Sequence, residues 1–411
     1  MGSAKIKIAV ISSGHIPSQW AHSINTMKMA NAFSKLGHNV EVLTVERYLE
    51  RKNKQRIKDI YKFYGISKNI KILYFRDNFL FYLEEMKPFN WILWILKKIT
   101  KNRIRYIFDP ENQISEYCKK NNVDICYCRS YRTVFYNIKN KIPSIMESHT
   151  PNIKHPDLQR VIKLSHSKYF KGLVTISDIL KQNFMKAGIP KDKILVLQDG
   201  VDIESFQNIK KTEARANLGL PQDKSIIMYC GHLYKGRGIE YILDAAKILK
   251  DKNVMFAIVG GFPSDVSYWK KYANDMGLVN VVFTGFVENG MVPTYLKAAD
   301  VLLMPYTRDT PTYKWMSPLK LFEYMAAGQP IIATDLVAIK ERIENLKTGI
   351  LVKEKSGKEI ANAVRLILDN RVLANKLSRN AAKEVEKYSL RKRAEAILNK
   401  FVSENNSYRK K

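Results

Sequence analysis

The sequence predicts an α/β protein in which two doubly wound parallel-sheet domains follow one another along the chain. The chain has 411 residues, of which 45% are hydrophobic, and this exceeds the roughly 150 residues of one domain. Short β-branched segments alternate with segments of helical periodicity, an order typical of right-handed parallel crossovers. The alternation begins near residue 6 and again near residue 226, so we expect two sheets.

The first domain is predicted over residues 1–200. Residues 6–11 form a β-branched run that ends in a loop containing Gly14, and residues 24–36 then carry apolar side chains at helical spacing. Residues 40–45 resume as a strand, which completes a strand, loop, helix and parallel strand. Further strands are predicted at residues 70–75, 125–128, 144–146, 173–176 and 194–196.

The second domain is predicted over residues 201–387, where the same order of strand, glycine-bearing loop and helix is repeated. Residues 388–411 are expected to contain a helix that crosses back to the first domain. Ligands of such sheets bind at the carboxyl ends of the strands. The strands are predicted at residues 226–229, 256–259, 281–284, 301–304 and 331–334, and the helices at residues 241–249, 268–276 and 319–327.

The formal net charge of +30 favours an anionic partner, which could be nucleic acid, an anionic membrane surface or a phosphorylated ligand. Residues 50–105 carry a disproportionate share of this charge. They also hold a short apolar run with Trp91 and Trp94, followed by Lys97 and Lys98. The run is shorter than the ~20 residues of a membrane span, and it predicts either an interfacial helix on an anionic membrane or a core helix.

The four cysteines form neither a disulfide framework nor a set of zinc ligands, so we predict reduced thiols that lie mostly in the core. The N-terminus enters an apolar strand without the apolar stretch and cleavage site of a signal peptide. We therefore expect a cytoplasmic protein that is peripheral on the inner face of the membrane.

Residues 317–334 carry the strongest signal of a binding site. The chain enters a helix at Ser317, Pro318 and Leu319, and the free amides of a helix N-terminus commonly hold a phosphate. Glu323, one turn into this helix, can accept hydrogen bonds from two neighbouring ribose hydroxyls. The alternative is an ordinary amphipathic helix with a solvated glutamate.

This segment and the ordered motifs around it resemble the retaining glycosyltransferases of family four. The resemblance covers nearly the whole chain and implies the GT-B architecture, in which two Rossmann-like domains face each other across a cleft. As a set, the motifs are far more specific than a single glycine loop. They lie at residues 175–177, 188–190, 193–194, 199–202, 231–238 and 283–287.

The resemblance implies a nucleotide-sugar donor bound mainly by the second domain. It places the base near Phe286 and Val287 and the ribose on Glu323, with the segment from Ser317 to Lys320 also contacting the donor. One position departs from the family, because Trp315 stands where many members have a glutamate that touches the donor sugar.

In the loop that follows the first strand of the second domain, three residues are candidates for binding the diphosphate. Arg237 matches the family's basic residue before glycine, Lys235 could supply a second charge, and His232 stands where many relatives have arginine. In this fold, fixed cations and amides usually stabilise the leaving group in place of a metal. A solvated basic turn is the alternative. We expect no metal and no other cofactor.

Two residues of the first domain complete the predicted site. Gly14 would let its backbone approach a ligand, or it would simply form a tight turn. His149 follows a predicted strand at the position where the family has a histidine against the transferred sugar. The resemblance further implies a front-face route to retention, in which the leaving phosphate helps to deprotonate the acceptor, so His149 is not assigned as a general base.

The predicted function is transfer of a sugar from a UDP- or GDP-sugar to a membrane-associated acceptor, such as a polyprenyl-linked or envelope glycan. A nucleotide-sugar 2-epimerase shares the architecture but lacks the segment that contains Glu323. A basic nucleic-acid-binding protein would require a recognisable module such as an RRM or a helix-turn-helix, and the sequence shows neither. We therefore expect no nucleic-acid partner.

Overall fold

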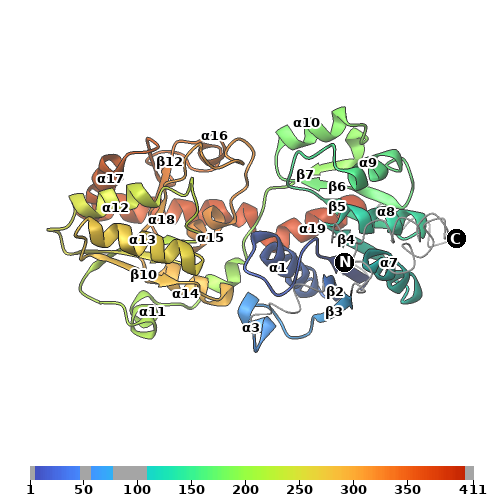
Figure 1. Ribbon diagram of the computed structural model, residues 1–411, viewed down its shortest axis with the longest axis horizontal. Helices are drawn as coiled ribbons and strands as arrows, with labels where there is room; N and C mark the ends of the chain where they lie inside the picture. Colours follow the sequence, from blue (N-terminus) through green and yellow to red (C-terminus); the bar gives the residue numbers. More distant parts are fainter. Residues whose placement is uncertain (1–4, 47–56, 77–108, 403–411) are drawn as a thin grey trace, which may run out of the picture. The chain divides into compact units, whose positions relative to one another are not determined.

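The computed structural model describes residues 5–46, 57–76 and 109–402. These residues form two compact units. Unit 1 comprises Met1–Gln198 together with Arg391–Lys411, and unit 2 comprises Asp199–Leu390 (Figure 1). The predicted membrane-facing residues Trp91, Trp94, Lys97 and Lys98 lie outside the described residues.

Unit 1 contains a seven-stranded parallel sheet in the order β3-β2-β1-β4-β5-β6-β7. The chain order reverses between β1 and β4, which are paired directly. Almost every residue of β1, β4, β5 and β6 is buried, as expected for strands covered on both faces. The strands are β1(Lys7–Ile11), β2(Asn39–Glu46), β3(Lys71–Arg76), β4(Ile125–Cys128), β5(Ser144–Glu147), β6(Phe170–Thr175) and β7(Ile194–Val196).

The helices of unit 1 come from both ends of the chain. Figure 1 shows α19, drawn in red, among the blue and green elements of this unit. The helices are α1(Ala21–Lys35), α3(Ile60–Tyr64), α7(Pro110–Lys120), α8(Tyr131–Lys139), α9(Pro156–Lys163), α10(Asp178–Lys186) and α19(Leu390–Phe401).

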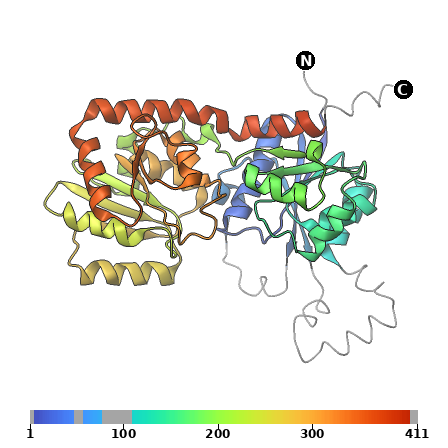
Figure 2. The same cartoon turned by 90° about the horizontal axis from the view of Figure 1, so that it is seen from above.

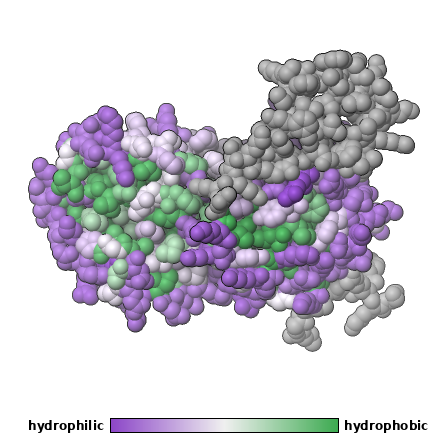
Figure 3. Space-filling view, turned by 60° about the horizontal axis from the view of Figure 1, so that its bottom comes forward, coloured by the Kyte–Doolittle hydropathy of each residue, from purple (hydrophilic) through white to green (hydrophobic). Residues whose placement is uncertain are grey.

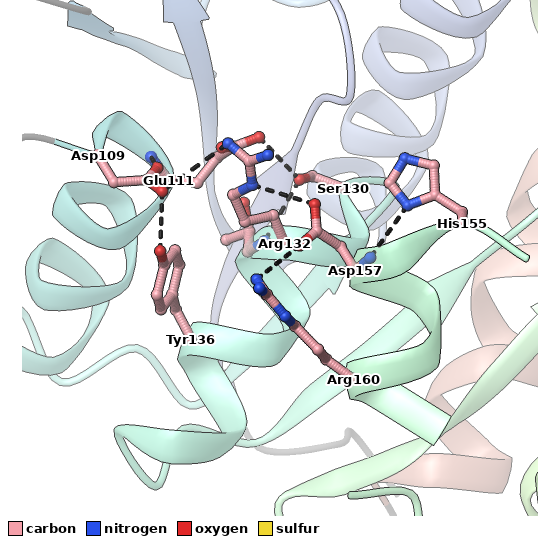
Figure 4. A network of polar contacts seen from close by, with 9 residues as sticks. Asp109, Glu111, Ser130, Arg132, Tyr136, His155, Asp157 and Arg160 are labelled. Atoms are coloured by element: carbon pink, nitrogen blue, oxygen red, sulfur yellow. Dashed lines mark hydrogen bonds and ion pairs between the residues drawn. The ribbon is translucent and has the colours of Figure 1, made fainter. Parts of the chain in front are cut away.

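An arginine-centred network joins α7, α8 and α9 (Figure 4). Arg132 of α8 donates to Asp157 of α9 over 3.1 Å and to Glu111 of α7 over 3.4 Å. Tyr136 donates to Asp109, whose carboxylate also caps α7. Burial, opposed by Arg132, raises the pKa of Glu111 to about 7. The network fixes these three helices against one another and so supports the strands that α7 and α8 connect.

Unit 2 contains a six-stranded parallel sheet in the order β10-β9-β8-β11-β12-β13. Both sheets confirm the predicted α/β class. The order reverses between β8 and β11, and in such sheets ligands bind beside this point at the carboxyl ends of the strands. The strands are β8(Ser225–Cys230), β9(Val254–Val259), β10(Val281–Gly285), β11(Val301–Met304), β12(Ile331–Thr334) and β13(Ile350–Val352).

The helices of unit 2 lie on both faces of its sheet. In Figure 2, α13 in yellow and α18 in red lie on opposite sides of the strands. The helices are α11(Lys211–Leu218), α12(Ile239–Ile248), α13(Pro263–Asp275), α14(Val292–Ala298), α15(Leu319–Ala327), α16(Val337–Lys340), α17(Gly357–Asp369) and α18(Arg371–Glu384). Short 3-10 helices of unit 2 occupy Ile203–Phe206, Asn289–Met291 and Val385–Tyr388, and one of unit 1 occupies Lys191–Lys193.

Several elements of unit 2 differ from the sequence prediction, and helices α11, α14, α16, α17 and α18 were not predicted at all. The sixth strand, β13, was not predicted, although its Ile-Leu-Val run is the same as the run from which β7 was predicted. Helix α13 begins at Pro263, five residues before the predicted start, because proline is well suited to the first turn of a helix.

The surface in Figure 3 is largely hydrophilic with apolar patches, and exposed apolar side chains of unit 2 include Tyr268, Tyr272 and Val279.

The predicted thiols are confirmed as free and buried at Cys118, Cys126, Cys128 and Cys230. In the part of the chain that the structure describes, none of the helices has the length and apolar character needed to cross a membrane.

Candidate active site

The loops that follow β8 and β11 meet at the reversal point of the unit 2 sheet. The guanidinium carbon of Arg237, from the loop after β8, lies 4.2 Å from the ring centre of Tyr306, which follows β11. It lies 4.5 Å from the ring of Tyr234, whose hydroxyl accepts a hydrogen bond from the same guanidinium. Aromatic faces stabilise a cation without neutralising it. Tyr306 was not predicted, because its contact with Arg237 depends on the pairing of β8 with β11.

Helix α15 spans the predicted residues and carries Lys320 and Glu323. Its apolar side chains are buried, and the hydroxyl of Tyr324 accepts a hydrogen bond from the backbone N–H of Cys230 over 2.9 Å. This bond ties the helix to the end of β8. The helix therefore holds Lys320 and Glu323 beside the loop that carries Arg237.

Lys320 lies directly on Gly231, the first residue after β8. A Cβ atom at Gly231 would come within 1.3 Å of the Lys320 Nζ, so a side chain there would displace this ammonium. Its φ of 152° is also one that other residues rarely adopt. The Nζ lies 5.1 Å from the ring centre of Tyr229, so the ammonium is covered on a second side.

Arg237 and Lys320 form a pair of cations that no carboxylate in the described part of the chain neutralises by an ion pair. Among the described residues, no carboxylate lies within ion-pair distance of either group, and the buried Nε of Arg237 has no hydrogen-bond partner there. Burial and the charge of Arg237 lower the pKa of Lys320 to about 8. Buried charges are costly unless an opposite charge compensates them. The arrangement is therefore suited to bind an anion.

Glu323 is partly buried, and its negative charge contributes to the surroundings of Lys320 and Tyr306, opposing the lowering of the lysine pKa. Phe286 and Val287 follow β10 at the same carboxyl edge of the sheet. The Phe286 side chain is 38% exposed, whereas Val287 packs partly against the core. An exposed ring at this edge can stack on a planar base.

The start of α15 differs in detail from the prediction. The hydroxyl of Ser317 accepts a hydrogen bond from the backbone N–H of Asp199 over 2.8 Å, so it is already engaged within unit 2. Pro318 is the N-cap residue and has no N–H to donate. The donors that this helix start can offer an anion are thus the amides of Leu319 and Lys320, because the Leu321 amide already donates to the carbonyl of Pro318.

The other two predicted residues of the β8 loop have different surroundings. The His232 ring stacks on Phe262 at 5.1 Å and on Tyr234 at 5.8 Å between ring centres. Lys235 is exposed. The pKa of Asp309 is lowered mainly by hydrogen bonds from Lys355 and Thr307, and the charge of Lys235 makes a smaller contribution in the same direction. Of the predicted cations, Arg237 and Lys320 are brought together, whereas Lys235 lies at the surface.

In unit 1, His149 follows β5 and contacts Glu147, the last residue of that strand. The His149 Nε2 and the Glu147 Oε1 are 2.5 Å apart. The predicted strand ends one residue earlier, at residue 146, and no role was predicted for Glu147. The sequence signal for this contact was the spacing of two residues between Glu147 and His149, because alternate residues of an extended segment lie on the same side.

Gly14 lies against a side chain of its own unit. A Cβ atom at Gly14 would come within 2.1 Å of the His22 Nε2, so the imidazole occupies the space next to this glycine. Burial and the charge of Arg129 lower the pKa of His22. The absence of a side chain at Gly14 therefore accommodates His22 of α1.

Two family models match the chain. The model described as Glycosyltransferase Family 4 matches residues 25–205, and the model described as Glycosyl transferases group 1 matches residues 210–384. Together they cover most of both units.

Individual relatives are also glycosyltransferases. An uncharacterized glycosyltransferase of Methanocaldococcus jannaschii is 27% identical over 299 residues, which cover 68% of this chain and 75% of that protein. The N,N'-diacetylbacillosaminyl-diphospho-undecaprenol alpha-1,3-N-acetylgalactosaminyltransferase of Campylobacter jejuni is 24% identical over 237 residues, with coverage of 56% and 60%. For several other relatives, the chain spans about half of their length.

Solved structures share the fold. The crystal structure of the HepE protein of Anabaena in complex with UDP and glucose superposes with a TM-score of 0.66. The identity is 14%, and the match covers 96% of this chain and 98% of that one. This likeness supports the GT-B fold for the two units.

Proposed function

Because the chain belongs to the group 1 glycosyltransferases of family four, which transfer glycosyl groups, we propose that its donor is a UDP- or GDP-sugar and that it retains the anomeric configuration. The observation that carries the proposal is the pair of cations, Arg237 and Lys320, at the reversal point of the unit 2 sheet. A nucleoside diphosphate would pair directly with these two cations, which no carboxylate of the described residues does within ion-pair distance.

In this proposal six of the predicted residues have a stated role. Arg237 binds the diphosphate as a planar fork, and Lys320 binds it as a point charge. Glu323 accepts hydrogen bonds from the ribose, and Phe286 with Val287 contacts the base. In unit 1, His149 binds the transferred sugar.

We also propose that the reaction requires no metal ion. Negative charge develops on the diphosphate as the sugar leaves, and donors fixed in advance stabilise such charge efficiently. Arg237, Lys320 and the amides of α15 provide donors of this kind. The leaving phosphate would then accept the proton of the attacking hydroxyl.

The proposed acceptor is a polyprenyl-linked or envelope glycan at an anionic membrane surface, and the proposed location is the inner face of that membrane. Two features support this choice. The net charge of +30 favours anionic surfaces, and the Campylobacter relative is named for an undecaprenol-diphosphate acceptor. HepE, bound to UDP and glucose, supports a UDP-sugar as the first donor to test.

The function is tested by incubating the protein with a panel of UDP- and GDP-sugars, with and without EDTA. We expect one nucleoside diphosphate to raise the melting temperature, since a ligand that binds the folded state stabilises it. With a polyprenyl-diphosphate-linked acceptor, we expect EDTA-resistant transfer and an anomeric configuration that matches the donor.

Three results would contradict parts of this proposal. Conversion of the free nucleotide sugar to its 2-epimer would identify an epimerase. Activity that EDTA abolishes and Mg²⁺ restores would contradict metal independence. An inverted product would contradict retention.

The Lys320 charge predicts a pH dependence of donor use. Below a pH of about 8 the ammonium is charged, and above it the group loses its proton, because its pKa is lowered to about 8 by burial and by Arg237. We expect kcat/KM for the donor to fall about tenfold, or about 1.4 kcal/mol, as the pH rises through this range. Lys320→Arg stays charged and should abolish the decline, whereas Lys314→Arg, an exposed control in the preceding loop, should retain it. An identical decline in the Lys320→Arg variant would assign the pH effect to another group.

A further inference from the structure

A buried row of charged side chains adjoins His149 in unit 1. The Glu147 carboxylate is fully buried, and its Oε1 lies 2.5 Å from the His149 Nε2. The same oxygen lies 3.3 Å from an amino nitrogen of Arg393 and 3.7 Å from one of Arg129. One carboxylate thus contacts an imidazole and two guanidinium groups.

The surroundings of Glu147 define its protonation. Burial disfavours the charged form, but Arg393 and His149 outweigh this effect and hold the pKa of Glu147 below its ordinary value. The carboxylate is therefore ionised at neutral pH and can only accept hydrogen bonds. The nitrogen of His149 that faces it, Nε2, must then carry the proton. In the neutral ring this leaves Nδ1 as an acceptor.

Arg393 is fixed independently of Glu147. It lies on α19 with 4% of its surface exposed, and it donates two hydrogen bonds to the backbone carbonyls of Leu197 and Gln198, at 2.7 Å and 2.8 Å. Both carbonyls follow β7 in unit 1. The guanidinium therefore joins α19, the end of β7 and the end of β5.

We propose that Glu147 is a positioning residue that fixes His149 in the Nε2–H form, and that Arg393 holds Glu147 in place for this purpose. The Nδ1 of His149 then accepts a hydrogen bond from a hydroxyl group of the transferred sugar. This step rests on the proposed function, in which His149 contacts the sugar. It narrows the donor class to sugars that present a hydroxyl there, because a site built to bind a hydroxyl discriminates against the deoxy analogue.

The test combines kinetics with NMR of the full chain. In the wild type, the ¹⁵N shifts of His149 should show the Nε2–H form alone. In Glu147→Gln, the amide can donate as well as accept, so we expect a mixture of the two neutral forms. We expect kcat to fall about tenfold, whereas the dissociation constant of the nucleoside diphosphate, bound by unit 2, stays unchanged.

Variants of α19 provide the matched comparison. Arg393→Met should reproduce the Glu147→Gln effects on the His149 spectrum and kcat, and Arg393→Lys should restore them in part. Arg391→Met removes an exposed arginine of the same helix, which pairs with Glu395, and should match the wild type. If Arg393→Met does not fold, Arg393→Lys and Glu147→Gln carry the comparison.

The possible outcomes separate this inference from the proposed function. An unchanged tautomer and an unchanged kcat in Glu147→Gln would overturn the inference even if the chain transfers sugars. A changed tautomer in a chain that transfers no sugar from any donor would support the positioning role and overturn the proposed function. An equal loss of kcat in Arg391→Met and Arg393→Met would show a general effect of α19 and overturn the role of Arg393.

Discussion

Arg237→Met is expected to lower kcat by about 10²–10³, equivalent to about 2.7–4 kcal/mol of transition-state stabilisation. The guanidinium lies against the rings of Tyr306 and Tyr234, and no described carboxylate pairs with it. Its full charge is thus available to the departing diphosphate, on which negative charge grows as the sugar leaves. An interaction that strengthens in the transition state affects kcat more than the binding of the donor. Single-turnover rates at saturating donor measure this effect directly.

Two further variants control for charge and for folding. Arg237→Lys keeps the charge but loses the planar fork and its contact with the rings, so we expect an intermediate rate. Arg308→Met removes an exposed arginine of the same unit, which pairs with Glu354, and should have the wild-type rate. A folded Arg237→Met variant with wild-type kcat would remove this residue from the mechanism.

Glu323→Ala is expected to weaken the binding of the nucleoside diphosphate about 10- to 100-fold, or by about 1.5–3 kcal/mol, the range for hydrogen bonds to a charged group. The residue is partly buried on α15, which Tyr324 fixes to β8, so the carboxylate is held in place before the ligand binds. Isothermal titration calorimetry measures the dissociation constant of the nucleoside diphosphate for the wild type and for Glu323→Ala.

The ligand can be varied together with the residue. If Glu323 binds the ribose hydroxyls, the 2′,3′-dideoxy nucleotide should bind the wild type and Glu323→Ala with equal affinity. Glu213→Ala, an exposed glutamate of unit 2 that pairs with Lys210, serves as the matched control. The same loss of affinity for the dideoxy nucleotide as for the ribonucleotide would show that Glu323 does not act through the ribose.

Most of the fold could be predicted because its elements have local signals. The bounds of α15 and of β11 were predicted without error, since apolar periodicity and a following glycine define the helix and a short apolar run before a proline defines the strand. The prediction missed β13, although β13 has the same Ile-Leu-Val run as the predicted strand β7, and it missed the start of α13, where the periodic pattern begins after the first turn.

The sequence allowed the residues of the candidate site to be identified, but it did not predict the contacts between them. Arg237, Lys320 and Glu323 were identified from their motifs, and the resemblance to the family supplied their roles. The contacts of Arg237 with Tyr306 and of Lys320 with Gly231 depend on which strands are neighbours, which no local pattern encodes. The contact of Glu147 with Arg393 joins segments separated by the whole of unit 2, so it was missed as well.

The return of α19 to unit 1 has a consequence for biosynthesis. During translation, residues up to Gln198 leave the ribosome first, and domains generally begin to fold in this order. Arg393 is made only after the whole of unit 2, so Glu147 has no such partner while the rest of the chain is being synthesised. A message truncated anywhere before codon 393 therefore yields a chain in which His149 lacks its complete support, even where every earlier residue is present.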